Sequence, residues 1–495
     1  MIGDREMKRP AAGLLFAVLS FILLIPTLLL GEDIIRLDPN VSPVSQTVEL
    51  NLDAEKTEYS GSVAINLAVM EATDTFRFHA ENMTVDRIAL KQGETIFAIT
   101  TEIGAEGTVT ATISQEISAG KYTFEIDFHK NYNTKAVGLY RVLQEDTGYL
   151  FSQFQATDAR KAFPCWDEPS YKIPFQFTIH IPENQVAVTN TPIASETISA
   201  GIKTIVYQKT KPLPSYLLAI AAGPLESVEI SGLSVPGRIY TTKGHSHLTE
   251  YAIQTTPPIL AAIEAYFGKS YPYEKLDFIA IPEYWPGAME NPGAVTYKDQ
   301  LLLIDSQTAS VRQKRRLVYV TAHELAHMWF GDLVTMKWWD DLWLNESFAD
   351  WLAEKISHSL YPQFKIDIDE LQALQWLFAN DARPSTRPIR RPVLKSTDIV
   401  EDLGLAYGKG KKILGMVEQW IGEEAFRSGV VNYLDTHAWG NAGAADLWHS
   451  LSGAANQNVE EMLASFLEQP GYPMVSILPQ ADDGFTISQR RFLNY

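Results

Sequence analysis

The first half of the chain, from about residue 33 to 225, alternates between apolar and polar residues. A period of two is typical of strands that bury one face. The apolar positions of the clearest strands are Val48, Leu50 and Leu52; Val63, Ile65, Leu67 and Val69; Tyr122, Phe124, Ile126 and Phe128; and Ile173, Phe175, Phe177, Ile179 and Ile181. Pro174 indicates that the last of these strands lies at a sheet edge. The pattern predicts a β-sandwich-like N-terminal domain that acts as a scaffold.

After about residue 245 the apolar period becomes helical. The best examples are Ile413, Leu414, Val417 and Trp420, and then Met462, Leu463, Phe466 and Leu467. Residues 381–404 are rich in Pro, Arg, Ser and Asp, which predicts a long surface loop between helices. From about Tyr472 the alternation returns, so we expect a short strand-like tail.

The segment Ala11–Leu30 is uncharged and strongly apolar. Twenty such residues can cross a bilayer as a helix of about 30 Å. Arg5, Lys8 and Arg9 precede the segment and acidic residues follow it, which predicts that the remaining chain lies outside the cytoplasm. A retained anchor and a cleaved signal both fit. We therefore expect a membrane-anchored or secreted protein, periplasmic or extracellular, that contacts the lipid bilayer through this segment.

Composition excludes several classes. The 495 residues carry a net charge of −19, with 60 acidic and 41 basic side chains, so a nucleic-acid partner is not expected. The single cysteine, Cys165, excludes an internal disulfide. We interpret Cys165 as a small buried residue and not as a nucleophile.

The segment His323-Glu324-Leu325-Ala326-His327 carries the most specific chemistry. Residues four apart share one face of a helix, so both imidazoles can bind one metal ion while Glu324 points into the same space. Residues 317–330 lack Gly and Pro, and Gly331 is the expected end of the helix. Two histidines alone bind zinc weakly, and a catalytic site needs a third protein ligand.

Glu346 is the best candidate for that ligand, with eighteen residues between it and His327. Asp350 follows four residues later, where its carboxylate can accept the second N–H of a ligating histidine. We expect one Zn²⁺ per chain, with Glu324 as the general base for water. In the alternative interpretation the two histidines are ordinary helix residues and Glu346 is a solvated charge.

These residues resemble the gluzincin aminopeptidase family, which includes aminopeptidase N, puromycin-sensitive aminopeptidase and leukotriene hydrolase. The resemblance rests on the zinc motif followed by Glu346, and on the segment Gly287-Ala288-Met289-Glu290-Asn291. In that family the glutamate of this second segment binds the free α-amine of the substrate, a role that the resemblance gives to Glu290. The alternative for Glu290 is an ordinary loop glutamate.

Two further residues take their roles from the resemblance. Gln155, in a stretch that leads into 159–169, matches a Glu or Gln that completes the amine site, and Tyr407 matches the tyrosine that hydrogen-bonds the oxyanion. The sequence departs from the family at Ser347, where Gly is usual, and at Pro292, where Trp is common. Both departures are expected to affect the first substrate pocket, and Gln155 removes one negative charge from the amine site.

The resemblance implies a thermolysin-like α+β zinc peptidase domain after the β-sandwich-like domain. We predict a cytoplasmic stub with an anchor or signal at 1–32, the β domain at 33–225, the catalytic domain at 226–470, and the start of a truncated β-sandwich domain at 471–495. The expected partners are peptides with a free N-terminus. A zinc endopeptidase, an epoxide hydrolase and a non-catalytic peptide-binding module remain alternatives.

Overall fold

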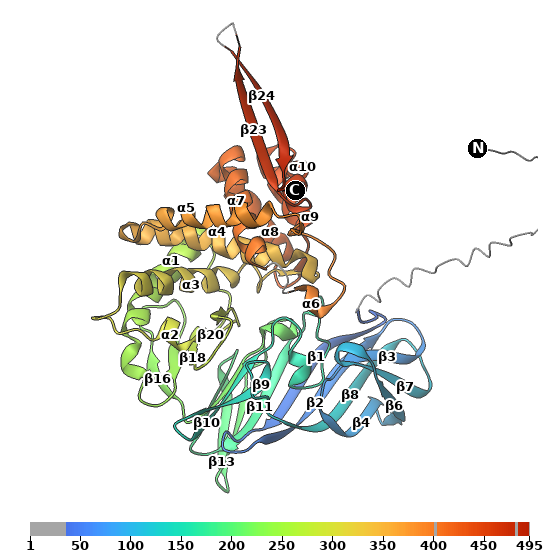
Figure 1. The fold of residues 1–495 in the computed structure, drawn as a ribbon. Helices are drawn as coiled ribbons and strands as arrows, with labels where there is room; N and C mark the ends of the chain where they lie inside the picture. Colours follow the sequence, from blue (N-terminus) through green and yellow to red (C-terminus); the bar gives the residue numbers. More distant parts are fainter. Residues whose placement is uncertain (1–35, 400–402, 481–483, 495) are drawn as a thin grey trace, which may run out of the picture. The chain divides into compact units, whose positions relative to one another are not determined.

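The structure is a computed structural model that describes residues 36–399, 403–480 and 484–494 (Figure 1). Its largest sheet has eight strands in the order β13-β14-β11-β1-β2-β8-β4-β5. Their bounds are β1 Val41–Asn51, β2 Glu58–Val69, β4 Thr84–Gln92, β5 Thr95–Phe97, β8 Gly120–Asn131, β11 Phe175–Pro182, β13 Ile193–Ser199 and β14 Ile202–Tyr207. The four strands expected from the alternation are β1, β2, β8 and β11.

Two smaller sheets complete the β-rich N-terminal domain. One has the order β3-β7-β6, and the other has the order β12-β15-β10-β9. Their bounds are β3 Thr73–His79, β6 Ile99–Ile103, β7 Thr108–Ile117, β9 Gly138–Gln144, β10 Thr147–Gln153, β12 Val186–Thr189 and β15 Ile220–Gly223. Phe124 of the large sheet contacts Phe76 and Phe78 of β3, with ring centroids 5.1 Å apart in both pairs. The apolar faces of two sheets therefore meet, which confirms the expected β-sandwich-like domain.

The edge position expected for the strand after Pro174 is wrong. Strand β11 lies inside the eight-stranded sheet, parallel to β1 and antiparallel to β14. Pro174 comes directly before the first strand residue, and its carbonyl accepts a hydrogen bond from the Gln46 amide at 3.1 Å. A proline at the start of a strand removes no donor that the ladder needs, so it does not exclude an interior strand.

The second half is built on a mixed sheet of five strands, in the order β16-β17-β18-β20-β19. Strand β18 is parallel to both of its neighbours, and the short edge strand β19 is antiparallel to β20. The bounds are β16 Glu226–Glu229, β17 Arg238–Thr241, β18 Asp277–Ile281, β19 Ala288–Met289 and β20 Ala294–Lys298.

The rest of this domain is mainly helical, as expected for an α+β peptidase domain. They are α1 Glu250–Phe267, α2 Asp299–Leu302, α3 Val311–His327, α4 Leu342–Leu360, α5 Ile366–Asp381, α6 Ser396–Ile399, α7 Leu403–Ile421, α8 Glu423–His437, α9 Ala444–Ala455 and α10 Val459–Leu467. Helix α4 packs between α3 and α7, and Figure 1 shows α3 on the side of strands β18 and β20. Of the loop expected at 381–404, the described residues 382–395 contain neither helix nor strand, and the short α6 follows them.

Short strands complete the described part of the chain. Strand β21 (Thr335–Met336) pairs with β22 (Asn441–Ala442), and β23 (Tyr472–Pro479) pairs with β24 (Phe485–Phe492) as an antiparallel hairpin. The hairpin is the strand-like tail expected from the sequence. The boundaries predicted at 225 and 470 stay predictions.

Two other expectations concern Cys165 and the N-terminal segment. Cys165 is fully buried, and burial raises the pKa of its thiol well above the ordinary value, which agrees with a structural role. Residues 11–30 lie outside the described residues. Within the described ranges, no helix combines the length and the apolar character needed to span a bilayer.

Candidate active site

Helix α3 presents the first two candidate metal ligands. It begins with a capping box, in which the Ser310 hydroxyl accepts from the Gln313 amide at 3.3 Å and the Gln313 side chain accepts from the Ser310 amide at 3.0 Å. It ends at His327, before the Gly331 predicted as its stop. Gly331 has a φ of +138°, and a Cβ there would lie 3.2 Å from His327 Nδ1. The glycine therefore leaves room for the imidazole beside the turn.

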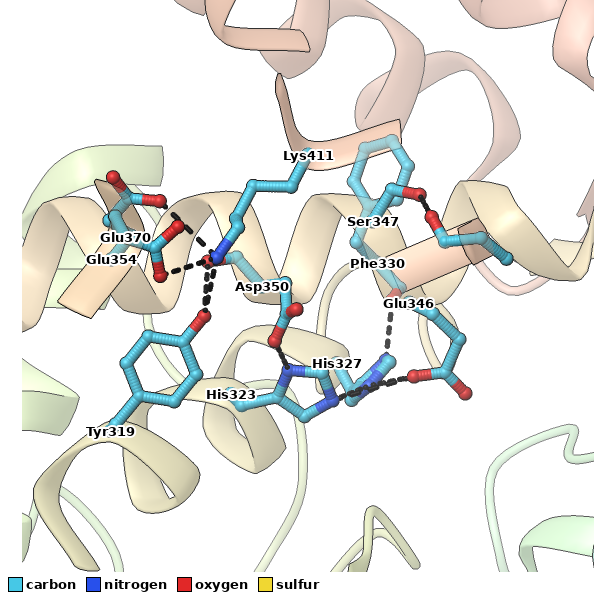
Figure 2. Close-up of polar contacts among 11 residues, drawn as sticks. Tyr319, His323, His327, Phe330, Glu346, Ser347, Asp350, Glu354, Glu370 and Lys411 are labelled. Atoms are coloured by element: carbon cyan, nitrogen blue, oxygen red, sulfur yellow. Dashed lines mark hydrogen bonds and ion pairs between the residues drawn. The ribbon is translucent and has the colours of Figure 1, made fainter. Parts of the chain in front are cut away.

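The three candidate ligands converge on one point (Figure 2). His323 Nε2 and His327 Nε2 lie 3.0 Å apart, and each lies 3.4 Å from Glu346 Oε2 on α4. Ligand atoms about 2.0–2.1 Å from a tetrahedral zinc ion are about 3.3 Å apart from one another. The three residues therefore have the donor types and the spacing that such an ion requires.

The other nitrogen of each imidazole is held by a separate partner. His323 Nδ1 contacts Asp350 Oδ1 at 2.9 Å, and His327 Nδ1 contacts the Phe330 carbonyl oxygen at 3.2 Å. Both oxygens are acceptors, so each Nδ1 donates its proton to one of them, and each Nε2 is the nitrogen left to bind a metal. The sequence pattern predicted that Asp350 would accept from a histidine. The partner of His327 is a backbone carbonyl, which every residue has, so the sequence carries no signal for it.

The acidic residues of the site differ in their environments. Burial opposes ionisation of Glu346, but its contacts with His323 and His327 outweigh burial and hold its pKa below the ordinary value. Burial also opposes ionisation of Asp350, and the hydrogen bond with His323 again leaves the pKa lowered. For Glu324, burial dominates and raises the pKa to about 8. Glu346 and Asp350 are therefore anionic, whereas burial favours the neutral form of Glu324.

A cavity of about 410 Å³ opens beside these residues. His323, Glu324 and Glu346 line it together with Tyr407 from α7. The Tyr407 ring stacks on His323, with centroids 5.9 Å apart and an interplanar angle of 24°. Burial and the nearby Glu346 carboxylate raise the pKa of Tyr407 well above its ordinary value, so the phenol keeps its proton as a hydrogen-bond donor.

The segment 287–291 reaches the same cavity. Gly287, Ala288 and Glu290 line it, whereas Met289 and Asn291 are not among the described residues that line it. Met289 is buried, with its sulfur 3.8 Å from the Gln153 amide nitrogen, and the Asn291 amide donates to Thr296 Oγ1 at 3.2 Å. These two residues fasten the segment to its neighbours.

Glu290 itself is buried without a complete set of partners. Its side chain is only 4% exposed, and within the described part of the chain its Oε1 has no hydrogen-bond partner. Burial raises its pKa, and the nearby His327 and His323, which act in the opposite direction, do not offset it. A buried carboxylate oxygen without a partner, at the edge of a cavity, suits a ligand that carries a hydrogen-bond donor.

Gln155 lies on the same cavity, next to residues that the sequence analysis did not select. Gln153, Trp285, Leu301 and Arg316 also line the space. Gln153 accepts a hydrogen bond from the Tyr284 hydroxyl and donates to the Gln155 carbonyl at 3.4 Å. Arg316 lies seven residues before His323, so the helical period of α3 carried a signal for it. Gln153, Trp285 and Leu301 come from other elements and had no common pattern.

Ser347 and Pro292, the two departures from the family, are not among the described residues that line the cavity. The Ser347 hydroxyl donates to the Ala406 carbonyl at 2.7 Å, one residue before Tyr407. Ser347 also lies against Gly410, where a Cβ would come within 1.9 Å of the hydroxyl oxygen. Its contacts therefore fix how closely α4 and α7 approach.

Comparisons with known proteins agree with this geometry. A family model described as Peptidase M1 N-terminal domain matches residues 42–217, and one described as Peptidase family M1 domain matches residues 251–466. Aminopeptidase 2 of Candida albicans is 35% identical over 466 residues, which are 92% of this chain and 50% of the relative. The puromycin-sensitive aminopeptidase of Caenorhabditis elegans is 33% identical over 478 residues, 93% of this chain and 50% of the relative. The chain thus spans about half the length of the curated relatives it matches.

A third relative corrects the expected location. Aminopeptidase 2, mitochondrial, of Saccharomyces cerevisiae is 33% identical over 470 residues, 92% of this chain and 49% of the relative. Its name places that protein inside the cell. The expectation of a membrane-anchored or secreted protein with an extracytoplasmic catalytic domain is therefore wrong, and the expected contact with the bilayer stays a prediction. The apolar character of the segment Ala11–Leu30 alone was not sufficient to predict the location of the protein.

The resemblance to gluzincin aminopeptidases is confirmed, because both family models fit the expected order of domains and the relatives match nearly the whole chain. The chain belongs to the M1 peptidase family.

Proposed function

We propose that the protein is a zinc-dependent aminopeptidase that hydrolyses the N-terminal residue from peptides. The observation that carries the proposal is the presence of two different features at one cavity of about 410 Å³. They are three convergent ligand atoms, and the buried carboxylate of Glu290 with an oxygen that has no partner among the described residues. An aminopeptidase needs both a metal site and a counter-charge for an ammonium group.

His323, His327 and Glu346 are the proposed zinc ligands, and the spacing of their atoms supports this assignment. Zinc, when bound, polarises a carbonyl and lowers the pKa of water. Glu324 adjoins the ligand His323 and lines the cavity. We assign it the role of general base that accepts a proton from water and later gives it to the leaving amine.

Glu290 and Gln155 are the proposed anchors for the free α-amine. An ammonium group can donate a charge-assisted hydrogen bond to the unpartnered Glu290 oxygen. The Gln155 carbonyl oxygen can accept a second hydrogen bond but supplies no charge. Because this pair would hold the amine at a fixed distance from the metal ligands, it would limit cleavage to one residue.

Tyr407 is the proposed donor to the oxygen of the scissile carbonyl as negative charge develops there. Its protonated phenol and its position over His323 support this role. Ala288 and Gly287 line the cavity beside Glu290, so we propose that their backbone shapes the binding site for the first residue. Met289 and Asn291 would support that segment without substrate contact.

The direct test compares one peptide with a free and an acetylated N-terminus, together with metal analysis of the purified full chain. We expect about one zinc per chain and release of the first residue from the free peptide only. Internal cleavage of the acetylated peptide would favour an endopeptidase. A metal-free active protein would rule out the proposed function.

A further inference from the structure

A layer of polar side chains lies beside the candidate metal ligands, and one of its members, Tyr319, also lines the cavity (Figure 2). Tyr319 precedes His323 by four residues on α3, and Glu354 follows Asp350 by four residues on α4. Positions four apart lie on one helix face, so these two side chains continue the faces that form the site. The third member, Lys411, comes from α7.

Lys411 is the centre of this outer layer. Its Nζ donates to Tyr319 Oη at 3.1 Å and to Glu370 Oε1 at 2.8 Å, and it lies 3.3 Å from Glu354 Oε2. The residue is 6% exposed. One buried ammonium group therefore contacts side chains from α3, α4 and α5, and two carboxylates offset the cost of burying its charge.

The outer layer connects to the metal ligands through Asp350. The Tyr319 hydroxyl donates to the Asp350 backbone carbonyl at 3.3 Å, while Asp350 Oδ1 accepts from His323 Nδ1 at 2.9 Å. Tyr319 and His323 are on the same helix, so Lys411 braces both ends of the contact between His323 and Asp350. Lys411 also follows Tyr407 by four residues, and so anchors the helix that carries the proposed oxyanion donor.

We propose that Lys411 is a positioning residue for the metal site, which holds α3 and α4 so that Asp350 keeps its hydrogen bond to His323. The inference rests on the proposed function, because it takes His323 to be a zinc ligand. Partners that orient a ligating histidine typically contribute 10–100-fold to metal affinity. Lys411 acts one contact further out, so the lower end of that range is the expected effect.

Lys412 provides a matched control on the next position of α7. It also pairs with Glu354 and Glu370, at 3.3 and 2.8 Å, but its side chain is 32% exposed. Within the described residues Lys412 contacts these two carboxylates, and neither Tyr319 nor Asp350. Lys411→Met and Lys412→Met therefore remove the same charge from the same carboxylates, and only the first cuts the connection to the site.

The test measures zinc affinity of the full chain by competition with a chelator, and kcat and KM at saturating zinc. We expect Lys411→Met to weaken zinc binding about tenfold and to lower kcat without a matching change in KM, whereas Lys412→Met changes zinc affinity less than about twofold. In an Asp350→Asn background, Lys411→Met should add less than about threefold, because both act through one contact. Tyr319→Phe should weaken zinc binding in the same direction, and it serves as the test if Lys411→Met does not fold.

A lower melting temperature with unchanged zinc affinity in Lys411→Met would show a merely structural role and overturn the proposal. The proposal would also be overturned if the Lys411 and Lys412 variants weakened zinc binding equally. The same holds if the double variant lost zinc affinity by the product of the two single losses at Lys411 and Asp350. A wild-type protein that binds zinc but cleaves no peptide would defeat the proposed function and leave this inference standing. A wild-type protein that binds no zinc would defeat both.

Discussion

The two sides of the cavity are built differently. The helical wall, formed by α3, α4 and α7, holds its two histidines in contacts with other parts of the chain, as with Asp350 beside His323. The strand wall, formed by segment 287–291 and the stretch at Gln155, leaves the Glu290 oxygen without a partner among the described residues. The difference suits two kinds of ligand: a metal that stays and a substrate that leaves. Residues that bind a permanent ligand are best held in position before it binds. Residues that bind a transient ligand must keep a hydrogen-bonding group unpaired until that ligand arrives.

The largest effect is expected on the helical wall, from Glu324→Gln. The substitution removes the proposed base but no metal ligand, so zinc content and the melting temperature should stay at the wild-type level. General acid–base catalysis typically contributes 10²–10⁴-fold, and we expect kcat to fall by about that factor. Metal analysis and steady-state kinetics check both statements. Wild-type turnover, or loss of zinc from the variant, would contradict the assignment.

Tyr407→Phe tests the same wall at its α7 edge. The phenol should contact the oxyanion only as charge develops, so kcat should fall by about 10²–10³ while KM changes little. The ring, which stacks on His323, is kept in this variant. A change confined to KM would show that Tyr407 only lines the pocket.

The strand wall should give smaller losses that depend on the substrate. Glu290→Ala removes the counter-charge for the amine. It should lower kcat/KM about 5–30-fold, which corresponds to a loss of about 1–2 kcal/mol of binding free energy in the transition state. Gln155→Ala should lower it less, because it removes a neutral acceptor. Gln155→Glu should tighten binding of the amine. If Gln155→Ala proves the more damaging change, the roles of the two residues are reversed.

Lys172→Met should leave turnover unchanged and alter the stability to a degree that depends on pH. Lys172, from the β-rich domain, donates to the backbone carbonyls of Asp332, Leu333 and Gly440 at 2.7, 2.8 and 3.2 Å. Burial lowers its pKa to about 7, against about 10.4 in an unfolded chain. Between these values the unfolded state binds more protons, so this residue makes stability rise with pH, by at most about 1.4 kcal/mol per pH unit.

Urea unfolding of both proteins at pH 7 and 9 measures this effect. The difference in unfolding free energy, wild type minus variant, should increase with pH. A difference that is constant or that falls would show that Lys172 stays protonated when buried, and that its carbonyl contacts outweigh desolvation.

The helical wall was largely predictable from the sequence, because its information is periodic. Residues 323, 327, 346 and 350 follow a spacing that a helix converts directly into a shared face. The prediction that α3 continues to Gly331 was wrong by one turn, because the carbonyl of Phe330 is used to hold His327 instead. Local propensity cannot anticipate that kind of contact.

The strand wall and the outer layer depend on tertiary contacts and were less predictable. Gln153 and Trp285 reach the cavity from different elements, and nothing in their spacing indicates that they meet. Lys411 was not selected because its relation to Asp350 depends on how α7 packs on α4, with Ser347 against Gly410. Pro174 gave a misleading signal for a related reason: a local rule about proline does not reveal which strands become neighbours.

The spacing of four residues on each helix also determines which changes in chain length the site can absorb. One residue inserted between His323 and His327 would rotate His327 by about 100° around the axis of α3 and carry its imidazole away from Glu346. The same insertion in the loop between α5 and α6 would lengthen a surface connection and leave all three helix faces aligned. We therefore expect that loop to accept insertions and deletions. The segments 319–327, 346–354 and 407–411 should not accept them, because even a position that tolerates substitution must keep the number of residues between the site residues unchanged.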